Sequence, residues 1–105
     1  MTTNDYIEFV CEQLNGIGII RYRKMFGEYM VYLNEKPVII VCDNVAYVKK
    51  LDCIKEMMIH AKVGTPYNGA KEHYILDVDD LSLCKSIVIE VEKHTSIPKK
   101  RNKKN

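Results

Sequence analysis

The chain has 105 residues, of which 47% are apolar and 29% charged, and its formal net charge is +2. This length fits one domain, and the composition is that of a soluble globular protein. No stretch approaches the roughly 18 apolar residues of a membrane span, and the N-terminus lacks the basic and apolar regions of a signal peptide. We therefore expect a cytoplasmic protein with no membrane partner.

Positive charge is concentrated at the C-terminal end. Five of the last seven residues are basic, namely Lys99, Lys100, Arg101, Lys103 and Lys104. Without these five, 11 basic residues face 14 acidic ones, so residues 1–98 carry a net charge of −3. A proline followed by Lys, Arg and Asn cannot bury enough apolar area to offset its ordering entropy. We predict a single domain over residues 1–97 and a disordered basic tail over 98–105, which either binds a polyanion weakly or keeps the chain soluble.

The spacing of cysteines and histidines gives no metal-binding motif. The cysteines are 31, 11 and 31 residues apart, no C-x-x-C pair is present, and the histidines are equally scattered: Cys11, Cys42, Cys53, Cys84, His60, His73 and His94. Zinc motifs group their ligands closely along the chain. We therefore predict no metal and no cofactor, with the cysteines reduced and acting as small apolar residues.

An amphipathic helix is predicted near the N-terminus. Its apolar positions follow the i, i+3, i+4, i+7 pattern at Ile7, Val10, Cys11 and Leu14. Thr2, Thr3 or Asn4 can cap its start, and Gly16 suits its end. The predicted helix runs from about residue 4 to 15.

From Ile17 the apolar period changes to two, which predicts strands. Gly27 ends the first predicted strand, and the side chains of residues 28–33 alternate again between the two faces of a second strand. Residues 38–42 are apolar on both sides, as in a central strand, and 45–49 form a fourth strand. Asn34-Glu35-Lys36 is a short polar turn, and Asp43-Asn44 predicts a tight hairpin because both residues accept positive φ. Short connections between four strands predict an antiparallel meander.

The second half of the chain is predicted to contain two helices and a short strand. Leu51, Ile54, Met58 and Ala61 mark a helix of about 11 residues, residues 64–69 form a loop, and 73–76 form a strand. A last helix spans about 80–95, capped by Asp79 or Asp80, although residues 87–91 also alternate as in a strand. The fold class is therefore α+β, a two-layer fold with an antiparallel sheet packed against helices in the order α-β-β-β-β-α-β-α.

The segment Arg23-Lys24-Met25-Phe26-Gly27, followed by alternating large residues, resembles the N-terminal domain of the TfoX/Sxy competence-regulator family. The positions that match the family pattern are Arg23, Met25, Phe26, Gly27, Tyr32, Asp43, Tyr47 and Lys49. Glu28 and Met30 stand where the family often has glycine. The resemblance implies helices packed on an antiparallel sheet, a link to regulation of competence or transcription, no cofactor and no established catalytic residues.

A nucleic-acid contact is the alternative function that the residues suggest. Arg21 and Arg23 point to the same side of a strand, and Lys24 and two tyrosines lie close by. Together with the basic tail, these side chains could bind the phosphates and bases of a nucleic acid. They also fit the ordinary solvent face of a sheet, and no helix-turn-helix signature is present.

His73 is the one residue in the sequence that suggests a catalytic role. A histidine needs a nearby carboxylate or nucleophile to act as an acid or base, and only Asp77, Asp79 and Asp80 are close in sequence. Capping and solvent exposure also account for these acids. No triad, phosphate loop or dinucleotide motif is present, so we predict that the chain is not an enzyme.

Seven tyrosines against two phenylalanines suggest amphipathic aromatic side chains at the edge of a thin core or at an interface. The candidates are Tyr29, Tyr32, Tyr47, Tyr67 and Tyr74, whereas Met57 and Met58 are expected to fill the core. Our leading hypothesis is a non-enzymatic regulatory domain that binds a protein partner or forms a homodimer.

Overall fold

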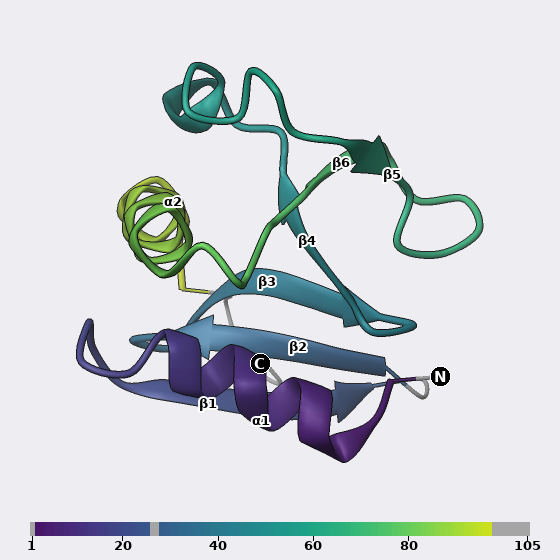
Figure 1. Ribbon diagram of the computed structural model, residues 1–105, viewed down its shortest axis with the longest axis vertical. Helices are drawn as coiled ribbons and strands as arrows, with labels where there is room; N and C mark the ends of the chain where they lie inside the picture. The colour runs from purple at the N-terminus through teal and green to yellow at the C-terminus, as the bar shows by residue number, and fades with distance from the viewer. Residues whose placement is uncertain (1, 26–27, 98–105) are drawn as a thin grey trace, which may run out of the picture.

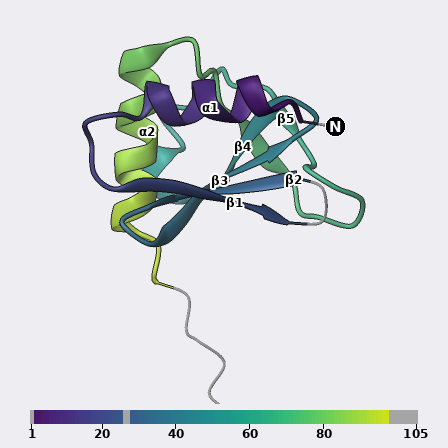
Figure 2. The same cartoon turned by 90° about the horizontal axis from the view of Figure 1, so that it is seen from below.

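The computed structural model describes residues 2–25 and 28–97 (Figure 1). The elements in chain order are α1 (Asn4–Gln13), β1 (Ile20–Met25), β2 (Glu28–Leu33), β3 (Lys36–Cys42), β4 (Val45–Lys49), the 3-10 helix η1 (Asp52–Ile54), β5 (Val63–Gly64), β6 (His73–Ile75) and α2 (Leu81–Lys93). The strands form one antiparallel sheet, and both helices lie on the same side of strands β1–β3 (Figure 2). The predicted α+β fold class is confirmed.

The sheet order is β1-β2-β3-β4-β6-β5, so the first four strands form the predicted meander. Its two later turns place both central residues at positive φ: Asn34 and Glu35 at 52° and 70°, Asp43 and Asn44 at 53° and 59°. Such turns match the right-handed twist of the strands that they join. The turn predicted from Asp43-Asn44 is therefore confirmed.

A β-bulge shapes the central strand β3. Val31 pairs with Ile39, but its neighbour Tyr32 pairs with Pro37, so Val38 is the extra residue. Pro37 has no N–H group to donate to the ladder, which is why a bulge is tolerated there. As a result, the consecutive residues Val38 and Ile39 are both buried, beyond what strict alternation allows.

The core lies between the helices and one face of the sheet. Helix α1 contributes Ile7 and Val10, and its C-cap residue Leu14 is buried with them, as the apolar pattern predicted. Helix α2 contributes its buried stripe of Cys84, Ile87, Val88 and Val91, which decides between the helical and strand interpretations of this segment. The caps are also as expected, because Thr3 Oγ1 accepts from the N–H of Tyr6 and Asp80 Oδ1 accepts from that of Leu83.

A polar network attaches the N-terminus to the β3–β4 turn. Thr2 Oγ1 donates to Glu28 Oε1 over 2.7 Å and accepts from the N–H of Asn44. Glu28 Oε1 also accepts from the N–H of Asp43. Glu28, at a position where the family often has glycine, thus has a structural role here, and so does the motif residue Asp43.

The segment between β4 and β6 differs from the prediction. In place of a helix over residues 51–61, the structure has η1 followed by turns, with i→i+3 bonds such as Ala61 N–H to Met58 C=O. Two of the four predicted apolar positions, Ile54 and Met58, are nevertheless buried, whereas Leu51 and Ala61 are half-buried against the core. The short strand β5 was not predicted. The predictions for Phe26, Gly27 and the tail 98–105 fall outside the described residues.

Candidate functional site

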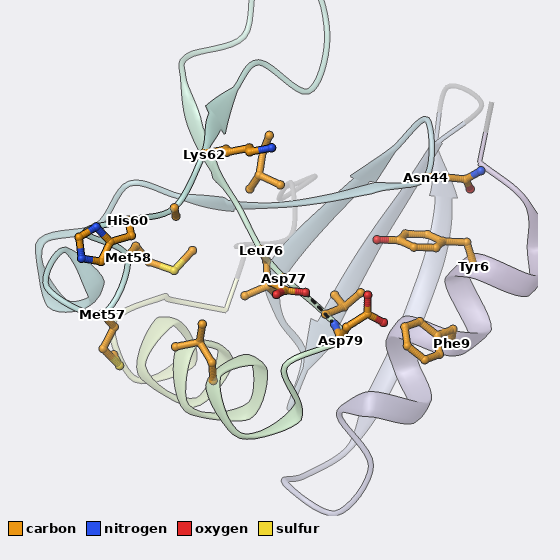
Figure 3. A pocket seen from close by; sticks show the side chains of 14 residues that line it. Tyr6, Phe9, Asn44, Met57, Met58, His60, Lys62, Leu76, Asp77 and Asp79 are labelled. Atoms are coloured by element: carbon orange, nitrogen blue, oxygen red, sulfur yellow. Dashed lines mark hydrogen bonds between the residues drawn. The ribbon is translucent and has the colours of Figure 1, made fainter.

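An open groove of about 860 Å³ lies between α1, the turns after η1 and the segment that joins β6 to α2. Most of its lining is apolar, and the lining residues are Tyr6, Phe9, Asn44, Met57, Met58, His60, Ala61, Lys62, Ile75, Leu76, Asp77, Val78, Asp79 and Leu83. Figure 3 shows Tyr6 and Phe9 on one wall and Met57, Met58 and His60 on the other, with Asp77 and Asp79 between them.

The aromatic wall follows from the position of two side chains on α1. Tyr6 and Phe9 are three residues apart, so they lie on the same flank of the helix beside its buried stripe. Both pack only partly against the core. Their remaining surface therefore faces the groove, where Figure 3 shows both rings.

The opposite wall is formed by the irregular segment after η1. Met58 is buried, as expected of a core residue, whereas Met57 is 37% exposed at the groove. Unbranched methionine side chains adapt their shape to different partners. One wall is thus aromatic and belongs to a helix, and the other presents an unbranched methionine side chain and is carried by turns.

The acidic residues between the walls are held by backbone contacts. The N–H of Asp79 donates to Asp77 Oδ1 over 3.1 Å, and Gln13 Nε2 of α1 donates to the C=O of Val78 over 2.7 Å. Burial and the nearby charge of Asp79 raise the pKa of Tyr6, so its phenol keeps its proton to higher pH than an exposed tyrosine does. The protonated phenol can donate a hydrogen bond. The groove thus combines apolar walls with two central carboxylates, and Lys62 also lines it.

His73 lies in a different place from these acids. It is only 8% exposed, and its Nδ1 lies 2.8 Å from the C=O of Lys71, while Nε2 has no hydrogen-bond partner in the described part of the chain. It lines a cavity of about 60 Å³ with residues that include Met30, Tyr47 and Lys49. No described carboxylate lines this cavity, so the structure does not bring together the histidine and acid that catalysis would need.

The basic residues of β1 are less available than the sequence suggests. Arg21 Nη2 lies 2.8 Å from Glu35 Oε1, and the guanidinium covers the Tyr32 ring at 4.5 Å from its centroid. The hydrogen bond to Arg21 lowers the pKa of Glu35. Arg23 is exposed on the same side as Arg21, but Lys24 points to the other side by strand alternation. Of the two arginines on this face of β1, Arg23 is therefore the one more available to contact a nucleic acid.

The other motif and tyrosine candidates are dispersed. Tyr32 and Tyr74 are buried, Tyr29 and Tyr47 are half-buried, and Tyr67 is exposed in the loop before β6. Tyr47 packs edge-on against His73, whereas Arg23 and Met25 belong to β1, away from that cavity in the sheet order. The family-motif residues that the structure describes are therefore not gathered into one site.

Two of the cysteines are unsuited to nucleophilic chemistry at neutral pH. Burial raises the pKa of the Cys11 and Cys84 thiols to about 11, so both stay protonated. Cys53 has different surroundings, because it lies beside Glu90 and His94 at the junction of η1 and α2. Among the described residues, these three side chains are the ones placed to hold a metal ion.

Neither the groove nor this three-residue cluster was predicted from the sequence. The i, i+3 pair Tyr6–Phe9 beside the apolar stripe was the available signal for the aromatic wall. Glu90 and His94 are separated by one helical turn, which also could have been noticed, but Cys53 is 37 residues before Glu90 and only the fold brings it near.

The fold and the groove define a small antiparallel α+β domain with an open, mostly apolar binding surface. No protein-family model matches the chain. It is similar to a Spirochaeta aurantia protein described as an uncharacterized 12.7 kDa protein in the trpE 5' region, with 37% identity over 76 residues. The match covers 72% of this chain and 66% of that relative, just under two thirds of its length. In the described residues, no helix has the length and apolar character needed to cross a membrane.

Proposed function

We propose that this chain is a cytoplasmic, non-enzymatic regulatory domain of the TfoX N-terminal type, which acts by binding another protein. The observation that carries the proposal is the groove of about 860 Å³ between Tyr6 and Phe9 on one side and Met57 on the other. Large, partly exposed aromatic and methionine side chains are typical of protein-binding surfaces. The sequence resemblance supports the regulatory role.

The occupant that fits the groove is an amphipathic helical segment of a partner protein. An apolar helix face can lie between the two walls, as in other helix-in-groove complexes. Asp77 and Asp79 in the middle favour a partner segment with a basic residue at the centre of its apolar face, since charge complementarity selects partners. A second copy of this chain is the alternative occupant.

Site-specific photo-crosslinking in cells tests this proposal. A photoreactive residue at Met57 should crosslink to one defined protein, whereas the same residue at Tyr67, which is 60% exposed outside the groove, should not. Asp79→Lys should reduce the Met57 crosslink because it reverses the central charge. Sequencing of the crosslinked peptide should identify an apolar segment with a basic residue.

Three results would count against it. Identical crosslinks from positions 57 and 67 would show that the groove is not selective. An unchanged crosslink in Asp79→Lys would remove the electrostatic argument. Crosslinks only between copies of this chain would identify a homodimer instead of a partner protein.

Nucleic-acid binding by the tail and β1 is the second candidate, and it is favoured by the exposed position of Arg23. Because Arg21 is paired with Glu35, Arg23→Ala should weaken DNA binding more than Arg21→Ala does. Affinity should fall with salt by up to roughly 0.9 log units per log unit for each phosphate contacted. Deletion of residues 99–105 should flatten that slope, and equal slopes for the full and shortened chains would exclude the tail.

A further inference from the structure

We propose that Cys53, Glu90 and His94 form a Zn²⁺ site that fastens η1 to α2. The thiol sulfur, a carboxylate oxygen and a ring nitrogen of these residues all lie within 4.8 Å of one another. Thiolate, imidazole and carboxylate are the ligands that zinc uses in proteins. This site is separate from the groove, and none of its three ligands lines it.

The fold positions the three ligands without any close spacing in sequence. Glu90 and the C-cap residue His94 are four residues apart, so they lie on the same side of α2. Cys53 reaches them from η1, with its Sγ 3.9 Å from the backbone oxygen of Glu90. A ring nitrogen of His94, Nδ1, lies 3.0 Å from that same oxygen. One carbonyl therefore holds both side chains beside the Glu90 carboxylate.

The dimensions suit a tetrahedral ion after a small contraction. Zinc binds sulfur at about 2.3 Å and nitrogen or oxygen at about 2.0–2.2 Å, so its ligands lie roughly 3–4 Å apart. Separations of up to 4.8 Å need side-chain shifts of about 1 Å. On binding, the thiol S–H bond breaks, its proton goes to solvent, and sulfur donates its electron pair to the ion. Water fills the fourth position.

The surroundings permit the ion to enter. Cys53 and Glu90 are half-buried, and His94 is exposed, so the cluster opens to solvent. Lys93 Nζ lies 3.3 Å from Glu90 Oε2, but a carboxylate has a second oxygen and further lone pairs for a metal. The Lys93 side chain is 59% exposed and can move away at little cost.

Occupancy of this site would also affect the groove. The turns that carry Met57 and Met58 begin directly after η1, and among described contacts η1 packs mainly on α2. An ion between Cys53 and α2 would hold the start of this wall in one position. Zinc would thus stabilise one of the two walls and leave the α1 wall unchanged.

Cobalt substitution of the metal-free full chain tests the site directly. Titration with Co²⁺ should saturate at one equivalent, with tetrahedral d–d absorption and a thiolate-to-cobalt charge-transfer band, and Zn²⁺ should displace it. Cys53→Ser should abolish the charge-transfer band, whereas Cys11→Ser, a half-buried cysteine of α1, should retain it. His94→Ala and Glu90→Gln should each weaken Zn²⁺ binding by at least about tenfold, since even outer partners of a metal contribute that much.

Circular dichroism and thermal melting show whether a variant loses metal binding because it is misfolded. His94 is exposed, so His94→Ala should keep the wild-type circular dichroism, with a metal-free melting temperature close to that of the wild type after loss of its contact with the Glu90 oxygen. Zn²⁺ should raise the melting temperature of the wild type but not of this variant. An identical Co²⁺ spectrum in Cys53→Ser, or no stoichiometric binding by the wild type, would overturn the proposal.

Discussion

The meander of residues 20–49 and the connecting segment of residues 50–80 are similar in length but differ in how the sequence determines them. In the meander, each strand pairs with its neighbour in the chain, and the turns at Asn34-Glu35 and Asp43-Asn44 place both central residues at positive φ, which Asn and Asp accept. In the connecting segment, η1 packs on α2, and β6 lies between β4 and β5. The first region is determined mainly by local signals, and the second depends on contacts with distant residues.

This difference bears on function, because one wall of the groove and one zinc ligand come from the connecting segment. A regular helix over residues 51–61 would direct Cys53 and Met57 differently. Irregular segments on a rigid scaffold commonly carry binding residues. The meander supplies that scaffold, and the turns after η1 supply an adaptable surface.

The most severe way to disturb the connecting segment is to remove its anchor in the core. Ile54 is fully buried at the end of η1, so Ile54→Ala should lower the free energy of unfolding by about 3 kcal/mol through lost burial and the cavity that remains. Chemical denaturation monitored by circular dichroism measures this loss. Without the anchor, the groove wall at Met57 should also lose its crosslink.

A matched control lies in the same segment. Ile59 is 67% exposed, so Ile59→Ala should change the unfolding free energy by no more than about 0.5 kcal/mol. Equal losses of unfolding free energy for the two substitutions would show that the segment has no fixed anchor. The connecting segment would then be less stable than the meander as well as less regular.

The sequence predicted the meander well because its signals are local. Alternation predicted a strand over residues 28–33, and Asp43-Asn44 predicted a turn, and the structure has both. For the connecting segment, the sequence predicted the buried positions Ile54 and Met58 but wrongly predicted a regular helix. Short helices are only marginally stable, so tertiary contacts select the backbone geometry there. The sheet position of β6 beside β4 was likewise beyond local signals.

The entry into the meander depends on two glycines with different surroundings. A Cβ at Gly18 would lie 2.7 Å from Leu33 Cδ1 and 2.8 Å from Asn34 Oδ1, and the latter accepts a hydrogen bond from the N–H of Ile19. Gly18→Ala should therefore cost about 2–3 kcal/mol of stability through overpacking and backbone strain. Thermal or chemical unfolding measures the loss.

Gly16 provides the comparison. Its φ of +98° favours glycine, but a Cβ there meets no atom within 4 Å. Gly16→Ala should cost only about 1 kcal/mol, from backbone strain alone. A Gly16→Ala variant less stable than Gly18→Ala would show that crowding at Leu33 is relieved by side-chain movement, and that the meander tolerates changes at its first strand.

The candidate site was much less predictable than the fold. His73 was a candidate for its chemistry and the β1 arginines for their charge, yet His73 lies in a small cavity away from Asp77 and Asp79. Which of these side chains meet depends on the turns between residues 55 and 72. Tyr6 and Phe9 were assigned to a helix, but the wall facing them could not be inferred without those turns.

The smallest predicted effect is a shift in the pKa of one tyrosine in each region, Tyr6 at the groove and Tyr47 in the meander. In the groove, burial and then Asp79 raise the pKa of Tyr6, whereas in the meander, burial and then Cys42 and Asp43 raise that of Tyr47. In an ultraviolet titration, the absorbance change lost in Tyr6→Phe should lie above pH 10. Asp79→Asn should shift that component to lower pH and leave the Tyr47 component in place.

The same shift predicts how stability depends on pH. In the unfolded chain a tyrosine ionises near its ordinary pKa of about 10, but folded Tyr6 holds its proton to higher pH. Its contribution to stability is therefore complete below pH 10 and is lost as the pH rises from there to the folded pKa. Tyr6→Phe should flatten this alkaline loss, with Tyr67→Phe as the exposed control. If Asp79→Asn left the Tyr6 component unchanged, the carboxylate would not act on the aromatic wall, and the argument for a basic partner segment would lose its support.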